Sequence, residues 1–246
     1  MIRFEHVAKH FGNQNVLRDV SYCVPRGLVS FVLGRSGAGK SVLSKLVVGL
    51  LYSDSGSVFF DNVLINTLSE QHLHDVRMRC QYIFQHATLF DSLTVLDNVA
   101  LPIRKHRGLN VRASRLLAEE QLAHLHVDDI AQQMPETLGP GQRKRVAIAR
   151  AMAMQPDCLL LDEPTTGLDP VAARRVDALI REVSIREGIT CMVVSHDLVS
   201  VRSIADNVAF LHEGSIAFQG KVEEFFASTT PCVRRFCGGD HTHGNR

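Results

Sequence analysis

The sequence predicts an α/β fold with a mainly parallel central sheet, and two apolar runs carry this prediction. The run Val29–Leu33 suits a buried strand, and Ser41–Leu50, after a short loop, has the pattern of a helix. A second run, Cys158–Leu161, ends in the adjacent carboxylates Asp162 and Glu163. Because continuous apolar runs are typical of strands buried on both faces, both runs are expected at the centre of a parallel sheet.

A glycine-rich loop lies between the first strand and its helix. Its residues are Gly34, Arg35, Ser36, Gly37, Ala38, Gly39, Lys40 and Ser41. This spacing is that of a phosphate-binding loop, because glycines let backbone N–H groups surround an anion at a helix N-terminus. Lys40 would neutralise the β- and γ-phosphates, and Ser41 would ligate Mg²⁺. The eight residues therefore predict a nucleotide-binding site.

The two carboxylates predict hydrolysis in addition to binding. Alternation along a strand places Asp162 and Glu163 on different faces. Asp162 can hold Mg²⁺, whereas Glu163 can orient or deprotonate the attacking water. The alternative interpretation is a buried strand that ends in two solvated acids. The phosphate-binding loop elsewhere in the chain favours the catalytic interpretation.

Strand and helix patterns divide the rest of the chain into three regions. Antiparallel strands are expected at residues 2–7, 16–24, 57–60 and 63–65, with a turn at Asp61-Asn62. Strand patterns return at residues 159–161, 191–194, 208–211 and 215–218. Between these regions, residues of about 86–155 predict a helical subdomain. In it a basic helix runs over 142–154, and one apolar face is made by Val111, Ala118, Leu122 and Leu125.

Several short motifs follow one another in an order that resembles the nucleotide-binding domain of ABC transporters. Besides the phosphate-binding loop and the two carboxylates, they are Tyr82-Ile-Phe-Gln85, Leu138-Gly-Pro-Gly-Gln142, Thr166-Gly-Leu-Asp169 and Val194-Ser-His196-Asp197. The resemblance covers the chain from Phe4 to about Phe226. It implies a P-loop NTPase fold of the ABC type over residues 1–230, with an antiparallel β subdomain and a helical subdomain, followed by a tail at 231–246.

The resemblance also implies a role for each motif. Phe11 would stack on adenine, and Gln85 would join Ser41 and Asp162 at the metal while coupling the site to a membrane partner. His196 would contact the γ-phosphate beside the catalytic Glu163. The implied cofactors are ATP and Mg²⁺. A lone Gln or His is more often a structural residue, and it is the order of the motifs that favours the functional interpretation.

The implied active site is shared between two copies of the chain. Asp169 would cross the interface of this homodimer. The segment Gly139, Pro140, Gly141 and Gln142 would cap the γ-phosphate held by the opposite copy. This segment departs from the usual Leu-Ser-Gly-Gly-Gln, because Gly139 lacks the hydroxyl and Pro140 lacks an N–H. The expected consequence is a weaker stabilisation of the transition state and slow turnover.

Three stretches resemble the ATPase subunits of Mla/Mce-type phospholipid transporters. They are 85–102, 188–197 and 231–238. The resemblance implies an MlaE-like permease, an MCE-domain lipid-binding protein and, in many systems, a STAS-domain protein as partners. It places the chain peripherally on the cytoplasmic face of the inner membrane. In this family the tail packs against the neighbouring copy.

Two other functions remain open. An amino-acid or methionine importer shares the Phe-Gln and Asn-Val-Ala-Leu-Pro patterns, but such ATPases often carry a regulatory domain, for which the stretch after Gly220 is short. A soluble ABC protein of DNA repair or of the ribosome usually has two cassettes or a long coiled-coil insertion, and neither is visible here. The cargo, the transport direction, the hydrolysis rate, dimerisation without the permease and a regulatory subunit cannot be deduced from the sequence.

Composition agrees with one sizeable core, or with a core and a small subdomain, and argues against nucleic acid as a partner. The chain has 246 residues, of which 45% are apolar, and a net charge of +1. Six cysteines without Cys-x-x-Cys spacing are expected to be reduced thiols. We expect no signal peptide. We also expect no membrane-spanning helix, because no apolar run approaches the roughly 20 residues that span a bilayer. The polar tail 231–246 is expected to be mobile, and its His241 and His243 to be solvated instead of binding a metal.

Overall fold

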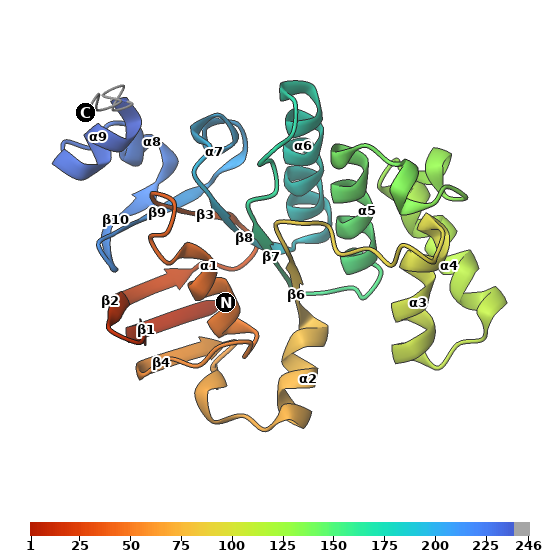
Figure 1. Ribbon diagram of the computed structural model, residues 1–246, viewed down its shortest axis with the longest axis horizontal. Helices are drawn as coiled ribbons and strands as arrows, with labels where there is room; N and C mark the ends of the chain where they lie inside the picture. The colour runs from red at the N-terminus through yellow and green to blue at the C-terminus, as the bar shows by residue number, and fades with distance from the viewer. Residues whose placement is uncertain (239–246) are drawn as a thin grey trace.

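The structure is a computed structural model that describes residues 1–238, and its framework is a ten-stranded sheet (Figure 1). The strands lie in the order β5-β4-β1-β2-β10-β9-β3-β8-β7-β6. They are β1 (Ile2–Phe11), β2 (Gln14–Val24), β3 (Val29–Leu33), β4 (Ser55–Phe60), β5 (Val63–Leu64), β6 (Cys80–Ile83), β7 (Cys158–Asp162), β8 (Thr190–Ser195), β9 (Asn207–His212) and β10 (Ser215–Lys221).

Nine α-helices accompany the sheet within the described residues. They are α1 (Lys40–Val47), α2 (Glu70–Arg79), α3 (Val95–Arg107), α4 (Val111–His124), α5 (Pro140–Met152), α6 (Pro170–Glu187), α7 (Leu198–Ile204), α8 (Val222–Phe226) and α9 (Pro231–Gly238). The predicted α/β class is confirmed. Strand β6 and the helices α2, α6 and α7 are additional to the elements that the sequence predicts.

The parallel half of the sheet is made of β9, β3, β8, β7 and β6. Strand β3 pairs with β8 on one side and with β9 on the other, β8 pairs with β7, and β7 pairs with β6, all parallel. Every residue of β3, β7 and β8 is buried, as their continuous apolar sequences predict. These three strands are therefore the centre of the fold.

The antiparallel half of the sheet is made of β1, β2, β4 and β5, as predicted. Strand β1 pairs with β2 and β4, and β4 turns into β5 at Asp61 and Asn62, which both have positive φ. Strand β10 pairs antiparallel with β9 and is joined to β2 by a single parallel residue pair, Ser215 with Asp19, so that it connects the two halves. The helix α1 lies between the two halves (Figure 1).

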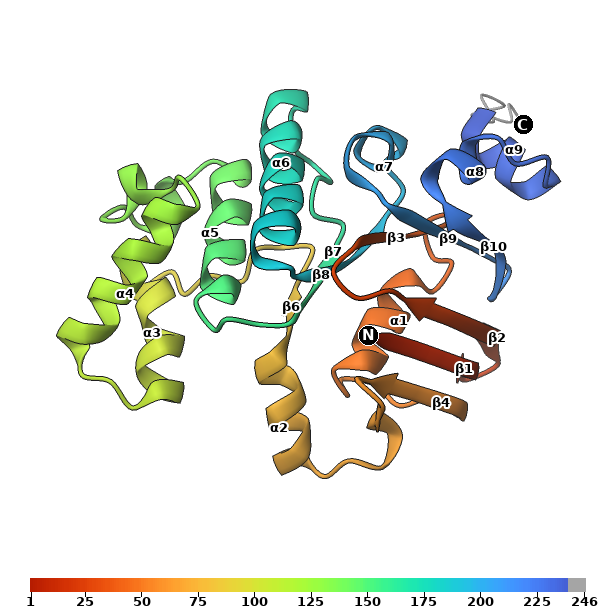
Figure 2. The ribbon, with the colours of Figure 1, turned by 180° about the vertical axis from the view of Figure 1, so that it is seen from behind.

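Two apolar cores lie on the two sides of the parallel strands. One core lies between the parallel strands on one side and α1 with the antiparallel half on the other, and it contains Phe4, Leu43 and Phe60. The other core is covered by α3, α5, α6 and α7 and contains Phe31 and Phe210. Figure 2 shows α3 and α4 at one end of the molecule and α8 and α9 at the other. The phosphate-binding loop is thus placed between two packed layers.

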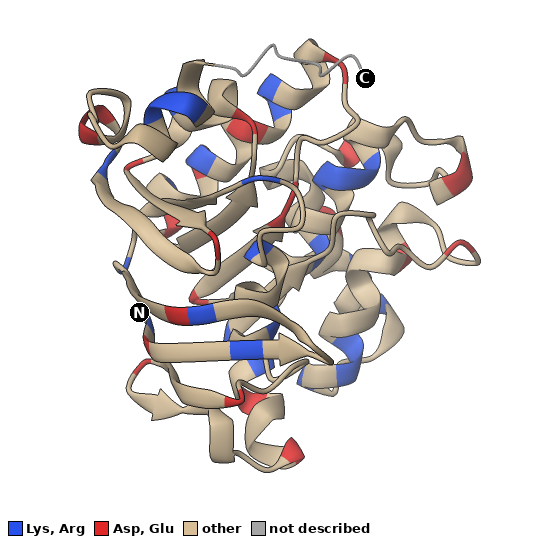
Figure 3. Cartoon of the chain, turned by 60° about the vertical axis from the view of Figure 1, so that its left-hand side comes forward, with Lys and Arg blue, Asp and Glu red and all other residues tan. Residues whose placement is uncertain are grey.

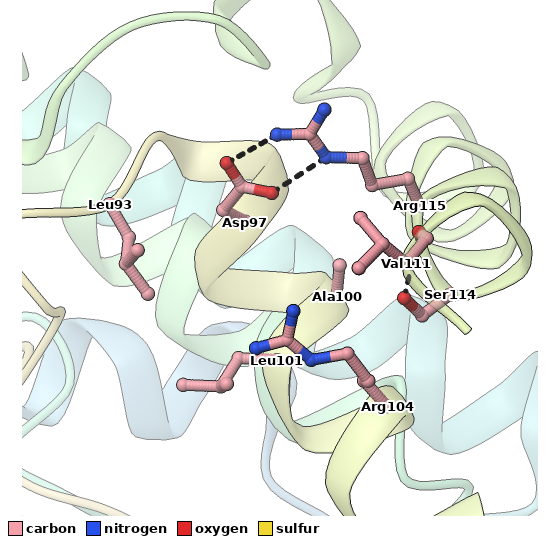
Figure 4. A pocket seen from close by; sticks show the side chains of 8 residues that line it. All are labelled: Leu93, Asp97, Ala100, Leu101, Arg104, Val111, Ser114 and Arg115. Carbon is pink, nitrogen blue, oxygen red and sulfur yellow. Dashed lines mark hydrogen bonds and ion pairs between the residues drawn. The ribbon is translucent and has the colours of Figure 1, made fainter. Parts of the chain in front are cut away.

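The helical region of about 86–155 contains α3, α4 and α5, as predicted. Ala118, Leu122 and Leu125 are buried, but Val111 is 50% exposed, so its predicted place on the buried face is wrong. The reason is that Val111 is the first residue of α4. There it lines a pocket between α3 and α4 (Figure 4). Arg115 of α4 joins Asp97 of α3 across this pocket by two hydrogen bonds of 2.8 and 2.7 Å.

The expected mobile tail is wrong for residues 231–238, which form the helix α9. Val233 is buried, and the ring of Phe236 lies 4.9 Å from the ring of Phe210 in β9. The apolar positions 233 and 236 are one helical turn apart, so they pack together on one side of the helix. His241 and His243 lie outside the described residues.

Charged residues of both signs are interspersed over the face drawn in Figure 3. None of the helices within residues 1–238 is long and apolar enough to span a membrane. Cys80, Cys158 and Cys191 are buried in the sheet, where burial strongly raises the pKa of the Cys158 and Cys191 thiols. These two thiols are therefore protonated and unreactive at neutral pH.

Replacing Phe236 by alanine tests the packing of α9. Phe236→Ala should lower the free energy of unfolding by about 2 kcal/mol, because a partly buried aromatic contact with Phe210 is lost. Chemical denaturation of the full chain measures this change. Arg235→Ala, an exposed position of the same helix, serves as the control and should stay within about 0.5 kcal/mol of the parent. Equal stabilities of Phe236→Ala and parent would show that α9 is not held by this contact.

Candidate active site

The candidate site lies at the carboxyl ends of three adjacent parallel strands. Leu33, the end of β3, pairs with Ser195 of β8, and Asp162, the end of β7, pairs with Val194 of β8. The phosphate-binding loop, Glu163 and His196 each follow directly after one of these strands. Ligand sites of open α/β sheets occur at this edge. The structure thus brings together most of the residues that the sequence predicts for binding and hydrolysis.

The phosphate-binding loop leads into α1, which begins at Lys40. Gly39 has φ of +99°, and a Cβ at this position would lie 2.8 Å from a methyl group of Val16, so only glycine fits. The Lys40 ammonium donates to the carbonyls of Gly34 and Arg35 at 3.0 and 3.1 Å. These contacts hold the buried ammonium inside the loop, where it can neutralise a bound phosphate.

A hydroxyl and a carboxylate meet next to this loop. Ser41 Oγ donates to Asp162 Oδ1 at 2.8 Å, and the phenol of Tyr82 donates to Asp162 Oδ2 at 2.8 Å. Burial and the hydrogen bond to Asp162 raise the pKa of Tyr82 strongly, so the phenol remains a donor. Oxygen ligands of this kind suit Mg²⁺. Tyr82 was not among the predicted site residues, although it is a polar residue of the strand that precedes Gln85.

Glu163 is held in an unusual backbone conformation. Its φ is +47°, a left-handed value that is uncommon for a residue with a side chain, and its N–H donates to the carbonyl of Val194 at 2.8 Å. The carboxylate is contacted by Thr166 Oγ1 and His196 Nδ1, both at 2.9 Å, and lies 3.6 Å from the Lys40 ammonium. Strained residues concentrate at active sites, so this observation supports the predicted importance of Glu163.

Gln85 lies in the loop after β6. Its side chain is exposed, while its carbonyl and that of Phe84 accept hydrogen bonds from the buried ammonium of Lys144 in α5. Burial lowers the pKa of Lys144 to about 8. The pattern of the sequence gives no reason to select Lys144, which is one of several basic residues in α5. The loop that carries Gln85 is therefore tied to the helix that begins at Pro140.

The segment Gly139–Gln142 and Asp169 form a second cluster, at the adjacent starts of α5 and α6. Helix α5 begins at Pro140, inside the segment expected to open it, and the Gln142 side chain accepts a hydrogen bond from the Gly139 N–H at 2.9 Å. One of the N–H groups expected to face a phosphate is thus already engaged. Asp169 caps α6 by accepting from the N–H groups of Val171 and Ala172, whose hydrogen bonds lower its pKa.

Phe11 lies apart from the other predicted residues, at the end of β1. Its ring is 46% exposed, and the Lys9 ammonium lies 5.4 Å from the ring centroid. An exposed aromatic face next to a cation can stack on a base. The placement of Phe11 is compatible with its predicted contact with adenine.

A phosphate-binding loop beside two carboxylates, at the edge of a parallel sheet, defines a P-loop ATPase. A family model described as "ABC transporter" matches residues 17–166 of the chain. The protein belongs to the ABC transporter family, in which it is an ATP-binding and ATP-hydrolysing subunit. The predicted family, fold and enzymatic activity are confirmed.

Two relatives of the chain are named for different transport functions. The intermembrane phospholipid transport system ATP-binding protein MlaF of Escherichia coli K12 is 36% identical over 93% of this chain and 85% of its own length. The methionine import ATP-binding protein MetN of Rhizobium etli is 41% identical over 97% of this chain and 66% of its own length.

Two solved structures share the fold. The ATP-binding cassette MJ0796, a dimer in a post-hydrolysis state with ADP and Pi, has a TM-score of 0.81 and 31% identity over 90% of this chain and 99% of its own. The protein cbiO1 of Clostridium perfringens, part of the transporter complex cbiONQ, has a TM-score of 0.84 and 30% identity, over 95% of this chain and 93% of its own.

Removing the hydroxyl of Tyr82 should weaken the binding of Mg²⁺ at the site. In Tyr82→Phe, Asp162 Oδ2 loses its donor, and we expect the Mg²⁺ concentration for half-maximal hydrolysis to rise about tenfold. The measurement is a Mg²⁺ titration of ATPase activity at saturating ATP. Tyr52→Phe, at a 44% exposed tyrosine, is the matched control. An unchanged titration curve for Tyr82→Phe would contradict a role of this phenol in positioning Asp162.

Restoring the usual residues at 139 and 140 should accelerate hydrolysis. The double substitution Gly139→Ser with Pro140→Gly supplies a hydroxyl and an N–H at the start of α5, and the rate should rise by up to about 100-fold. Steady-state ATPase assays of the assembled complex measure the effect. Gly139→Ala with Pro140→Gly separates the hydroxyl from the N–H. A double variant as slow as the parent would show that neither donor limits turnover.

Proposed function

We propose that the chain is the ATPase subunit of a phospholipid transporter of the Mla/Mce type. The observation that supports this proposal is the match with MlaF, which extends over most of both chains, whereas the match with MetN extends over 66% of the latter. The relevant partners would be an MlaE-like permease, an MCE-domain protein and a STAS-domain protein. Their association would hold the ATPase on the cytoplasmic face of the inner membrane.

The catalytic unit in this proposal is a homodimer with two shared sites. One copy supplies the phosphate-binding loop and Glu163, and the other supplies Gly139–Gln142 and Asp169. The dimeric state described for MJ0796 is consistent with this arrangement. Closure of the dimer around two ATP molecules would drive the permease, and hydrolysis would reset it. The domain division at residue 230, with a helical subdomain at about 86–155, is part of the same proposal.

Within one copy, different residues would bind the phosphates, the base and the metal. The N–H groups of Gly34–Lys40 and the Lys40 ammonium would hold the phosphates, and Phe11 would stack on the base. Ser41 and Asp162 would hold Mg²⁺, with Gln85 as a third ligand, and the metal would neutralise charge on the phosphate oxygens. Ser41 and Asp162 already lie within 2.8 Å of each other, so their oxygens fit one hard cation.

Glu163 and His196 would perform the chemistry. The Glu163 carboxylate, oriented by Thr166 and His196, would accept a proton from the attacking water or align it. His196, which contacts this carboxylate through Nδ1, would direct its other ring nitrogen towards the γ-phosphate. Both residues follow buried strands, which keeps their backbones in place during the reaction.

The permease would bind at the loop after β6 and the start of α3. This segment, roughly His86 to Pro102, exposes Phe90 and borders a hollow lined by Phe84, Thr88 and Arg150. Arg150 of α5 donates to the carbonyl of Thr88 in this segment at 2.8 Å, and Lys144 of α5 donates to the carbonyls of Phe84 and Gln85 directly before it. Movement of the permease would therefore reach the start of α5, where the opposite ATP is expected.

Capture of the membrane partners distinguishes this function from methionine import. The tagged chain is isolated from its own cell membranes in mild detergent, and copurifying subunits are identified by mass spectrometry. An MlaE-like permease together with an MCE-domain protein is the expected result. A methionine-type permease, for which the 41% identity with MetN is the specific argument, would overturn the lipid assignment and retain the ATPase.

Glu163→Gln should bind ATP but hydrolyse it at least about 100-fold more slowly, because an amide cannot accept the proton. The stalled variant should also accumulate as an ATP-bound dimer, which size-exclusion chromatography with light scattering measures. Glu182→Gln, on the outer part of α6, is the control and should retain the parental rate. Parental hydrolysis by Glu163→Gln would assign the reaction to another residue.

A further inference from the structure

A cluster of two acids and two hydroxyls, in which Asp177, Thr165 and Ser200 are buried and Asp197 is partly buried, adjoins the proposed catalytic pair in the sequence. Asp177 of α6 is 3% exposed, and its Oδ2 lies 2.8 Å from Ser200 Oγ of α7. The same Ser200 Oγ lies 3.1 Å from Oδ2 of Asp197. Thr165 Oγ1, from the loop after β7, lies 3.4 Å from both Ser200 Oγ and Asp197 Oδ2. The cluster connects three separate segments of the chain.

The cluster is connected through the backbone to both residues of the catalytic pair, His196 and Glu163. Asp197 directly follows His196 and caps α7 by accepting from the N–H of Val199 at 2.8 Å. Thr165 follows Glu163 by two residues. Any shift of Asp197 or Thr165 therefore displaces His196 or Glu163, whose side chains meet at 2.9 Å.

The hydrogen bonds of the cluster require more protons than its two hydroxyls supply. Ser200 carries one hydroxyl proton, yet its oxygen lies between two carboxylates. If it donates to Asp197, the contact with Asp177 is a hydrogen bond only when Asp177 carries a proton and donates it to Ser200. The other oxygen of Asp177, Oδ1, is buried and without a hydrogen-bond partner, which disfavours the ionised form further.

Within residues 1–238, Asp177 has no ion pair with a cation. Asp197, the N-cap residue of α7, is the charged group that acts on Asp177, and α5 contributes apolar residues such as Ile148 to the core beside α6. On α6 itself, Arg174 is exposed, and Arg181 is paired with Asp206 at 2.8 Å. Burial, followed by the charge of Asp197, raises the pKa of Asp177 to about 6, against a lowering by the Ser200 hydroxyl.

We propose that Asp177 is a positioning residue, and that a proton on its carboxyl completes the chain Asp177–Ser200–Asp197 that holds His196 against Glu163. This inference rests on the proposed catalytic roles of those two residues. When the proton leaves, two carboxylates face one hydroxyl and repel each other, and the start of α7 moves with His196. Hydrolysis is therefore favoured at acidic pH and falls as the pH rises through the pKa of Asp177.

The test compares the pH profiles of wild type and Asp177→Asn. Asparagine is neutral at every pH and can donate to Ser200 through its amide. Steady-state ATPase activity of the assembled complex is measured from pH 5.5 to 8.5, and each variant rate is divided by the wild-type rate, so that titration of other groups cancels. We expect a ratio near one at pH 5.5 that rises at least fivefold by pH 8. The change should lie in kcat, with KM for ATP altered less than twofold.

Two further variants make the test decisive. Ser200→Ala breaks the chain, so the ratio of its kcat to that of wild type should lie at least about fivefold below one at pH 5.5 and approach one at pH 8. It also keeps the inference testable if Asp177→Asn does not fold, which thermal unfolding reveals. Asp128→Asn, an exposed acid, should give a ratio near one at every pH.

The outcomes separate this inference from the proposed function. A pH-independent ratio for Asp177→Asn, or a Ser200→Ala enzyme that behaves as wild type, overturns the role of Asp177 while Glu163→Gln remains inactive. Full activity of Glu163→Gln would instead overturn the assignment of Glu163, and this inference with it. Because ATP hydrolysis is the readout, the identity of the transported molecule does not affect the result.

Discussion

The in-register pairing of β3, β8 and β7 is the constraint on which the site depends. The three strands are buried on both faces, and their hydrogen bonds set Leu33, Ser195 and Asp162 at neighbouring heights. A slip of one residue in β7 would turn Asp162 to the opposite face and separate it from Ser41. Because the ends of the strands are fixed, the starting positions of the loops that follow them are fixed as well.

Neutral hydroxyl groups orient the two carboxylates of the site, Asp162 and Glu163. Ser41 and Tyr82 each donate to one oxygen of Asp162, and Thr166 donates to Glu163. Hydroxyl groups orient a carboxylate without removing its charge, so both acids remain able to bind a cation or accept a proton. Lys40 supplies the positive charge close to Glu163, from a position fixed by two loop carbonyls.

Much of the fold could be predicted because its strands are short, apolar and bounded by glycine or acids. Val29–Leu33 and Cys158–Asp162 both have this form. The tail was harder, since Val233 and Phe236 lie in a short stretch interrupted by two arginines, and Phe210, the partner of Phe236, is distant in sequence. Val111 was misplaced because a regular apolar spacing does not reveal where a helix begins.

The predicted site residues were found from motifs, whereas their supporting residues depend on contacts between distant segments. Tyr82 meets Asp162 across two strands, and Asp177 meets Ser200 across two helices. Neither pair has a fixed spacing along the chain, so no local pattern could select it. Gln142 illustrates another limit, because its use as a cap for Gly139 follows from a side-chain conformation.

The close approach of α5 and α6 has a mechanical consequence. A Cβ on Gly141 would lie 2.8 Å from the Cβ of Ala172, so the first turns of the two helices are in direct contact. Pro140 stiffens the first of these turns, and Asp169 caps the second. Because the two helix starts pack directly against each other, we expect a displacement of either one to displace the other.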